Sequence, residues 1–207
     1  MTPNDPEALQ VAFLVFDVLE SLGRRYHLGG SYASSIHGIP RQTQDIDIVC
    51  DLKPGDAERL ATEVAEDFYC DRDRMAQAIS KRVSFNLVHL KTGVKIDLFP
   101  KGDDRYDSEE LERSQMIELG EPSRSVPVKT AEDTILRKLE WYRQGGEVSD
   151  RQWGDVLGIL RTQEDRLDLE YLRSRSETLG VGDLLAEALE EIEGQSANSP
   201  FSGPERP

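Results

Sequence analysis

Cysteine is scarce in this chain, and its two cysteines, Cys50 and Cys70, do not form a CxxC pair. Small secreted domains that depend on disulfides have many cysteines, and zinc sites require closely spaced thiol or imidazole ligands. Neither pattern occurs here. We therefore expect two buried thiols, and neither a disulfide framework nor a zinc centre.

Positive charge is also in short supply. The chain contains 25 lysines and arginines and 40 aspartates and glutamates, which gives a formal net charge of -15 and a pI of about 4.6. A general nucleic-acid binder needs clustered basic residues to neutralise phosphates. The composition argues against that class of protein, although Arg24, Arg25, Lys81 and Arg82 leave a local basic patch open.

Long hydrophobic runs are absent. The longest, Val11–Val18, is interrupted by Asp17 and is too short to span a bilayer. Asn4, Asp5 and Glu7 stand where a signal peptide would carry basic residues. We expect a soluble, cytoplasmic protein with no membrane partner. The 207 residues, 37% of them hydrophobic, suffice for one full domain and a smaller one.

The first half of the chain mixes helical and strand patterns. Apolar residues spaced three and four apart predict helices, and strict alternation predicts strands. The expected helices cover residues 7–23, with Asp5 as N-cap and Pro6 at the first helical position, 31–39, with Ser31 as N-cap, 55–69 and 75–80. The expected strands cover residues 25–30, 45–51, 82–90 and 92–99, the last two joined at Gly93 as a hairpin. This order indicates an α+β fold, with a mixed sheet that carries helices on one face.

The second half of the chain shows helical periodicity only. The expected helices cover residues 130–146, 149–160, 167–180 and 181–193, and residues 119–129 are expected to be a linker. Residues 195–207 lack apolar periodicity and are expected to form a disordered tail. We therefore predict a domain over residues 1–127, a small helical domain over 128–194 and the tail over 195–207.

Two carboxylates stand two residues apart in "DIDIV", at Asp45 and Asp47. Residues two apart in a strand point to the same face, about 6 to 7 Å from one another, while Ile46 and Ile48 would enter the core. The repulsion between such carboxylates is relieved by a shared proton or by a divalent cation, and oxygen-only ligands favour Mg²⁺ or Mn²⁺. The alternative is a solvated sheet face that carries a few acids.

Two further features bear on this choice. Gly29, Gly30 and Ser31 lie between an expected strand and an expected helix, where exposed N–H groups can hold a phosphate, although many Gly-Gly pairs are only turns. Asp97 lies in "KIDLF", on an expected strand of the same form as the first. If the two strands are neighbours, the three carboxylates of Asp45, Asp47 and Asp97 converge.

Together these segments resemble a known signature. "GGS", a spacer with "HG" and "RQT", then "DIDIV" and later "KIDLF" resemble the nucleotidyltransferase superfamily with the DNA polymerase β-like fold, and within it the minimal and AbiEii-like branch. The resemblance covers residues 25–99 well, and residues 131–160 more weakly. It implies a nucleotidyltransferase-type sheet domain followed by a small helical domain.

The resemblance also implies roles for single residues. Gly29, Gly30 and Ser31 would bind the triphosphate. Asp45, Asp47 and Asp97 would hold Mg²⁺ or Mn²⁺ in a two-metal arrangement for in-line displacement of pyrophosphate. Asp97 would also take the proton of the acceptor hydroxyl.

Each of three basic residues has two alternative roles. Arg41 would lie near the phosphates or the glycine turn, or would form a surface salt bridge. Lys138 matches a lysine of the family's helical segment and would reach the phosphates, or is an ordinary helix lysine. Lys95 shares a strand face with Asp97 and would pair with that carboxylate or meet a phosphate.

The sequence thus predicts an enzyme that moves a nucleoside monophosphate from an NTP, such as ATP, to a hydroxyl acceptor. The acceptor would be an RNA end, a protein side chain or a small molecule, and the acidic composition disfavours RNA. The branch adds the expectation of a toxin–antitoxin or defence context and of a possible partner protein. The alternative is a catalytically silent nucleotide-binding or antitoxin-like regulator of the same fold.

Overall fold

The computed structural model describes residues 6–43 and 45–197, and side chains over 7–43 and 45–194. These residues fall into two compact units. The sheet unit comprises the described residues up to Ile36 and from Pro40 to Thr130, and the helical unit comprises His37–Ile39 and the residues from Ala131 onward. The expected N-cap Asp5 lies outside the described residues.

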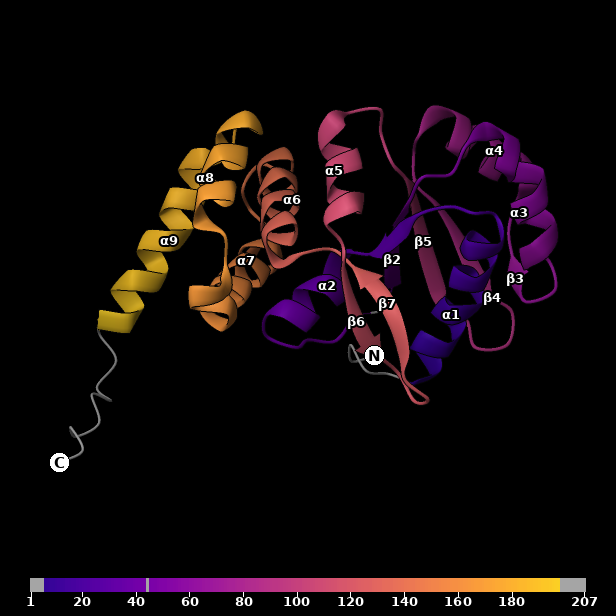
Figure 1. The fold of residues 1–207 in the computed structure, drawn as a ribbon, viewed down its shortest axis with the longest axis horizontal. Coiled ribbons are helices and arrows are strands. Elements are labelled where there is room, and N and C mark those ends of the chain that lie inside the picture. The colour runs from indigo at the N-terminus through magenta and orange to yellow at the C-terminus, as the bar shows by residue number, and fades with distance from the viewer. Residues whose placement is uncertain (1–5, 44, 198–207) are drawn as a thin grey trace. The chain divides into compact units, whose positions relative to one another are not determined.

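The sheet unit contains seven strands and five α-helices among its described residues. Its helices are α1 Pro6–Ser21, α2 Gly30–His37, α3 Ala57–Val64, α4 Arg72–Lys81 and α5 Arg105–Arg113. Its strands are β1 Tyr26–Leu28, β2 Asp45–Cys50, β3 Phe68–Tyr69, β4 Phe85–His89, β5 Lys95–Pro100, β6 Gln115–Leu119 and β7 Arg124–Val128. Figure 1 shows α3 and α4 side by side, close to β3 and β4.

The strands form one mixed sheet in the order β3-β4-β5-β2-β1-β7-β6. β2 is parallel to β5 and β1 is parallel to β7, whereas the other neighbouring pairs are antiparallel. The expected mixed sheet and the β4–β5 hairpin, with Gly93 at a positive φ of 73°, are therefore confirmed.

The core of the sheet unit fixes the register of its central strands. In β2 and β5 every second residue is buried, and Ile46, Ile48, Ile96 and Leu98 are fully buried in the cluster to which α1, α3 and α4 also contribute. Burying one such side chain stabilises the fold by about 1.5 to 3 kcal/mol. A slip of one residue would bring the intervening acids into the core, so the register of β2 against β5 is strongly specified.

One expected linker is wrong. Residues 119–129 contain β7, which pairs with β6 as an antiparallel hairpin and with β1 as a parallel neighbour. Gly120, Pro122 and Pro127 favour a loop in the sequence, but Val126 and Val128 are fully buried in the core. The burial of these two valines outweighs the weak strand propensity of the prolines. The helix α5 was also not expected; Asp104 caps it by accepting a hydrogen bond from the Tyr106 N–H.

The helical unit contains α6 Ala131–Gln144, α7 Asp150–Gln163, α8 Leu169–Thr178 and α9 Gly182–Ala197, in agreement with the expected helical segment. Ser149 caps α7 by accepting a hydrogen bond from the Gln152 N–H. α9 continues three residues into the expected tail, and residues 198–207 lie outside the described residues. None of the helices in the described ranges is long and apolar enough to cross a membrane.

Candidate functional site

Strand pairing brings the three aspartates of the sequence motif together. β2 and β5 are parallel neighbours, and Asp47 lies directly opposite Asp97, while Asp45 lies opposite Lys95. Paired residues on adjacent strands are about 5 Å apart and present their side chains on the same face. The condition for convergence stated from the sequence is therefore met. We call Asp45, Asp47 and Asp97 the aspartate cluster.

Lys95 neutralises part of the aspartate cluster. Its Nζ lies 2.7 Å from Oδ2 of Asp97 and 3.7 Å from Oδ1 of Asp45. The hydrogen bond to Asp97 is the main cause of a raised pKa of Lys95; partial burial opposes it, and the charges of all three aspartates add to it. Of the two roles that the sequence allowed for Lys95, an ion pair with Asp97 or a phosphate contact, the structure shows the ion pair.

The glycine turn, Gly29–Gly30, lies against the carboxylate of Asp47. The Gly29 N–H donates a hydrogen bond to the Asp47 carbonyl at 2.9 Å, which continues the β1–β2 pairing into the turn. Gly30 has a φ of +52°, and a Cβ at this position would lie 1.7 Å from Oδ2 of Asp47. Both the backbone conformation and the close approach therefore require glycine.

The helix α2 begins at Gly30, so the expectation of Ser31 as N-cap is wrong. Ser31 lies in the first turn, and its Oγ accepts a hydrogen bond from Nη2 of Arg41 at 2.6 Å. The first N–H groups of a helix have no partner within the helix, and the helix dipole favours an anion there. The structure thus places Ser31 and the Arg41 guanidinium together at the start of α2.

A buried ion pair next to the glycine turn was not expected from the sequence. Nζ of Lys129 lies 2.9 Å from Oε1 of Glu110, and the two side chains are 7% and 2% exposed. The Lys129 N–H donates to the Leu28 carbonyl, and a Cβ on Gly29 would lie 3.8 Å from Cε of Lys129. The Lys129–Glu110 pair therefore lies next to the glycine turn on its β7 side. Its two residues lie on α5 and just after β7, two of the elements that the sequence pattern did not reveal.

Lys138, the remaining expected nucleotide-binding residue, belongs to the helical unit. Its Nζ donates to Oδ2 of Asp155 at 2.8 Å, and the two side chains are 9% and 6% exposed. The pair connects α6 to α7. A contact of Lys138 with phosphate stays a prediction.

Replacing Lys138 with methionine is expected to destabilise the protein by about 3 to 5 kcal/mol, because the Asp155 carboxylate would stay buried without this cation. For a chain of this size that loss lowers the melting temperature by roughly 10 °C, which differential scanning calorimetry would measure. Lys81→Met, at an exposed position of α4, is the control and should change it little. A melting temperature unchanged in Lys138→Met would contradict a stabilising role, whereas a partial recovery in Lys138→Met/Asp155→Leu would support it.

Comparison with known proteins bears on the fold. No protein-family model and no curated protein sequence matches the chain. Among solved structures, an antigenic nucleotidyltransferase-like protein from Paracoccidioides brasiliensis aligns with a TM-score of 0.51 and 16% identity, over 90% of this chain and 93% of that one. The antibiotic-resistance factor ANT(2'')-Ia aligns with a TM-score of 0.50 and 11% identity, over 94% of this chain and 100% of that one. The chain therefore has a nucleotidyltransferase-type fold, as the sequence motifs indicated.

Proposed function

We propose that this chain is a metal-dependent nucleotidyltransferase, which moves a nucleoside monophosphate from an NTP to a hydroxyl acceptor. One observation carries the proposal: the core fixes the register that sets Asp47 opposite Asp97, beside a turn at which only glycine fits. A solvated sheet face would need neither the third carboxylate nor the close approach of Gly30 to Asp47. The arrangement therefore favours a site over an incidental group of acids.

The donor chemistry of the aspartate cluster fits Mg²⁺ or Mn²⁺. Its members offer only carboxylate oxygens, the ligands that these hard cations prefer. Over the described part of the chain, no three acidic, histidine or cysteine side chains are gathered closely enough to enclose an ion as they stand. Instead the Lys95 amine contacts Asp97 and Asp45. A divalent ion held by Asp45, Asp47 and Asp97 would compete with that amine and would offset the charge of the phosphates.

In this proposal the triphosphate binds at the glycine turn, on the β1 side of Asp47. The first turn of α2, which begins at Gly30, and the hydroxyl of Ser31 supply hydrogen-bond donors, and Arg41 supplies a positive charge at the same point. Lys129 holds the turn through its contact with the Leu28 carbonyl.

The reaction itself balances without a redox step. The oxygen of the acceptor hydroxyl attacks the α-phosphorus, the bond from this phosphorus to the bridging oxygen of pyrophosphate breaks, and pyrophosphate leaves. The hydroxyl proton goes to the Asp97 carboxylate, which lies on the sheet face with 18% of its side chain exposed. A regulator that only binds nucleotide has no need of this third carboxylate, which favours the catalytic alternative. A toxin–antitoxin or defence context and a partner protein stay predictions drawn from the resemblance.

A binding experiment tests the proposal. Each NTP, with and without Mg²⁺, is added to the full chain, and unfolding is followed by thermal shift. We expect Mg²⁺-dependent stabilisation, which is about 2.7 kcal/mol at an NTP concentration one hundred times Kd. Asp47→Ala should abolish it, because the cluster loses its central carboxylate. Asp73→Ala, an exposed acid on α4, is the control and should behave as the wild type. Equal stabilisation of Asp47→Ala and the wild type would refute the proposal.

A further inference from the structure

The aspartate cluster belongs to two neighbouring rows of side chains that run across the sheet. Asp97 pairs with Asp47 on β2 and, on its other side, with Asn86 on β4. The neighbouring row runs from Asp45 to Lys95, then to Val88 on β4 and Tyr69 on β3. Directly paired residues share a face of the sheet. Asn86, Val88 and Tyr69 therefore continue the face that carries the aspartates.

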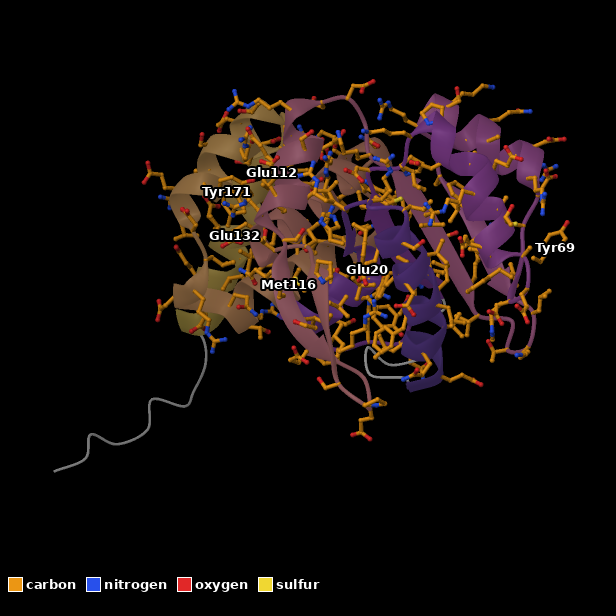
Figure 2. The ribbon with its side chains drawn as sticks, turned by 45° about the vertical axis from the view of Figure 1, so that its right-hand side comes forward. Glu20, Tyr69, Glu112, Met116, Glu132 and Tyr171 are labelled. Carbon is orange, nitrogen blue, oxygen red and sulfur yellow. The ribbon has the colours of Figure 1, made fainter. Side chains whose placement is uncertain are left out.

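This part of the face is open to solvent. Tyr69 is 68% exposed, Asn86 is exposed and Val88 is half-buried. Their neighbours along the strands, Phe68 and Leu87, are buried in the core on the opposite face. In Figure 2 the Tyr69 side chain extends outward at the edge of the ribbon. An exposed aromatic ring thus stands at the sheet edge, next to an amide and a short apolar side chain.

The geometry of in-line displacement indicates which side of the aspartate cluster the acceptor approaches from. The attacking and leaving oxygens lie on opposite sides of the phosphorus. With the triphosphate at the glycine turn, the leaving pyrophosphate lies on the β1 side of Asp47, so the acceptor must approach from the β4 side of Asp97. Asn86 is one strand and Tyr69 two strands from β5, which corresponds to about 5 and 10 Å. That span suits a molecule of one or two rings.

We infer that Asn86, Val88 and Tyr69 form the acceptor subsite, and that the acceptor is a small, ring-bearing hydroxyl compound that is neutral or cationic. The inference rests on the proposed function. Tyr69 would stack on the ring of the acceptor, and the Asn86 amide would form a hydrogen bond with a polar group of the acceptor. The two rows carry three carboxylates and one lysine, whose amine already contacts Asp97 and Asp45. A polyanion such as RNA would meet a negative surface here, which also agrees with the net charge of -15.

The experiment uses the full chain and NTPs labelled in the α-phosphate. Three acceptor sources from one cell lysate are tested separately: the low-molecular-mass filtrate, total RNA and the protein fraction. We expect label to appear in the filtrate only. With Tyr69→Ala the amount of filtrate needed for half-maximal rate should rise about tenfold, because the ring contact is lost. Tyr69→Phe, which keeps the ring, should restore it, and NTP affinity should be the same in all three proteins.

Met116→Ala is the matched control, because Met116 is an exposed apolar residue, 62% exposed, on the opposite edge strand β6 (Figure 2). It should leave the dependence on filtrate unchanged. Label in RNA or protein, or an unchanged dependence in Tyr69→Ala, would overturn the acceptor subsite while Mg²⁺-dependent NTP binding stands. A wild type that does not bind NTP would overturn the proposed function and this inference with it.

Discussion

Replacing Asp97 with asparagine is expected to lower the rate of nucleotidyl transfer by about 10²- to 10⁴-fold while much of the NTP binding persists. Asparagine has nearly the same shape as aspartate, but it cannot accept the hydroxyl proton and carries no charge for a cation. Asp47 and the glycine turn, which face the triphosphate in our proposal, are unchanged in this variant. Transfer of labelled nucleotide and Mg²⁺-NTP binding by thermal shift are measured side by side.

Two outcomes of the Asp97 experiment are informative. Asp67→Asn provides the control, because the Asp67 carboxylate forms an ion pair with the exposed Lys91, at 4.0 Å, and lies outside the aspartate cluster. Its transfer rate should equal that of the wild type. Wild-type transfer in Asp97→Asn would exclude the general-base role of Asp97, and loss of both binding and transfer would show that Asp97 acts mainly in nucleotide binding.

Replacing Gly30 with alanine is expected to abolish both NTP binding and transfer. The new Cβ would lie 1.7 Å from Oδ2 of Asp47, and so the carboxylate and the glycine turn must move apart. A side chain at a φ of +52° also costs about 1 to 2 kcal/mol of backbone strain. The same thermal-shift series with Mg²⁺ and NTP measures the melting temperature and the nucleotide response.

Gly93→Ala separates the two effects of the Gly30 substitution. Gly93 has a φ of +73° in the β4–β5 turn, but a Cβ there would meet nothing within 4 Å. Both variants should lose a similar amount of stability from backbone strain, and only Gly30→Ala should lose the response to NTP. If Gly30→Ala bound Mg²⁺-NTP as tightly as the wild type, the turn would not be part of the nucleotide site.

The strands of the candidate site could be predicted from local pattern alone. β2 and β5 alternate polar and apolar residues over their first four positions, and the apolar residues there, such as Ile46 and Ile96, are buried in the structure. The same alternation places Asp45 and Asp47 on one face. A period of two is a strong signal because one face of each strand is packed and the other is not.

The elements that the sequence pattern did not reveal have weak local signals. α5 is short and highly charged, and β7 contains Pro127 within "RSVPV". Their place in the fold depends on long-range contacts, such as the pair of Glu110 with Lys129 and the burial of Val126. Such contacts join residues that local periodicity cannot relate, so a linker was the expected structure for residues 119–129.

Residue order and spacing were enough to identify the candidate site residues: a glycine pair before a helix, two aspartates on one strand face and a third aspartate on a similar strand. The three-dimensional fold was needed to show that β2 and β5 are parallel neighbours with Asp47 opposite Asp97, that Lys95 lies among the carboxylates, and that Asn86 and Tyr69 extend the same face. Residue spacing fixes the face on which a side chain lies. The choice of neighbouring strand and its register follow from burial of the whole core, to which every strand and helix contributes.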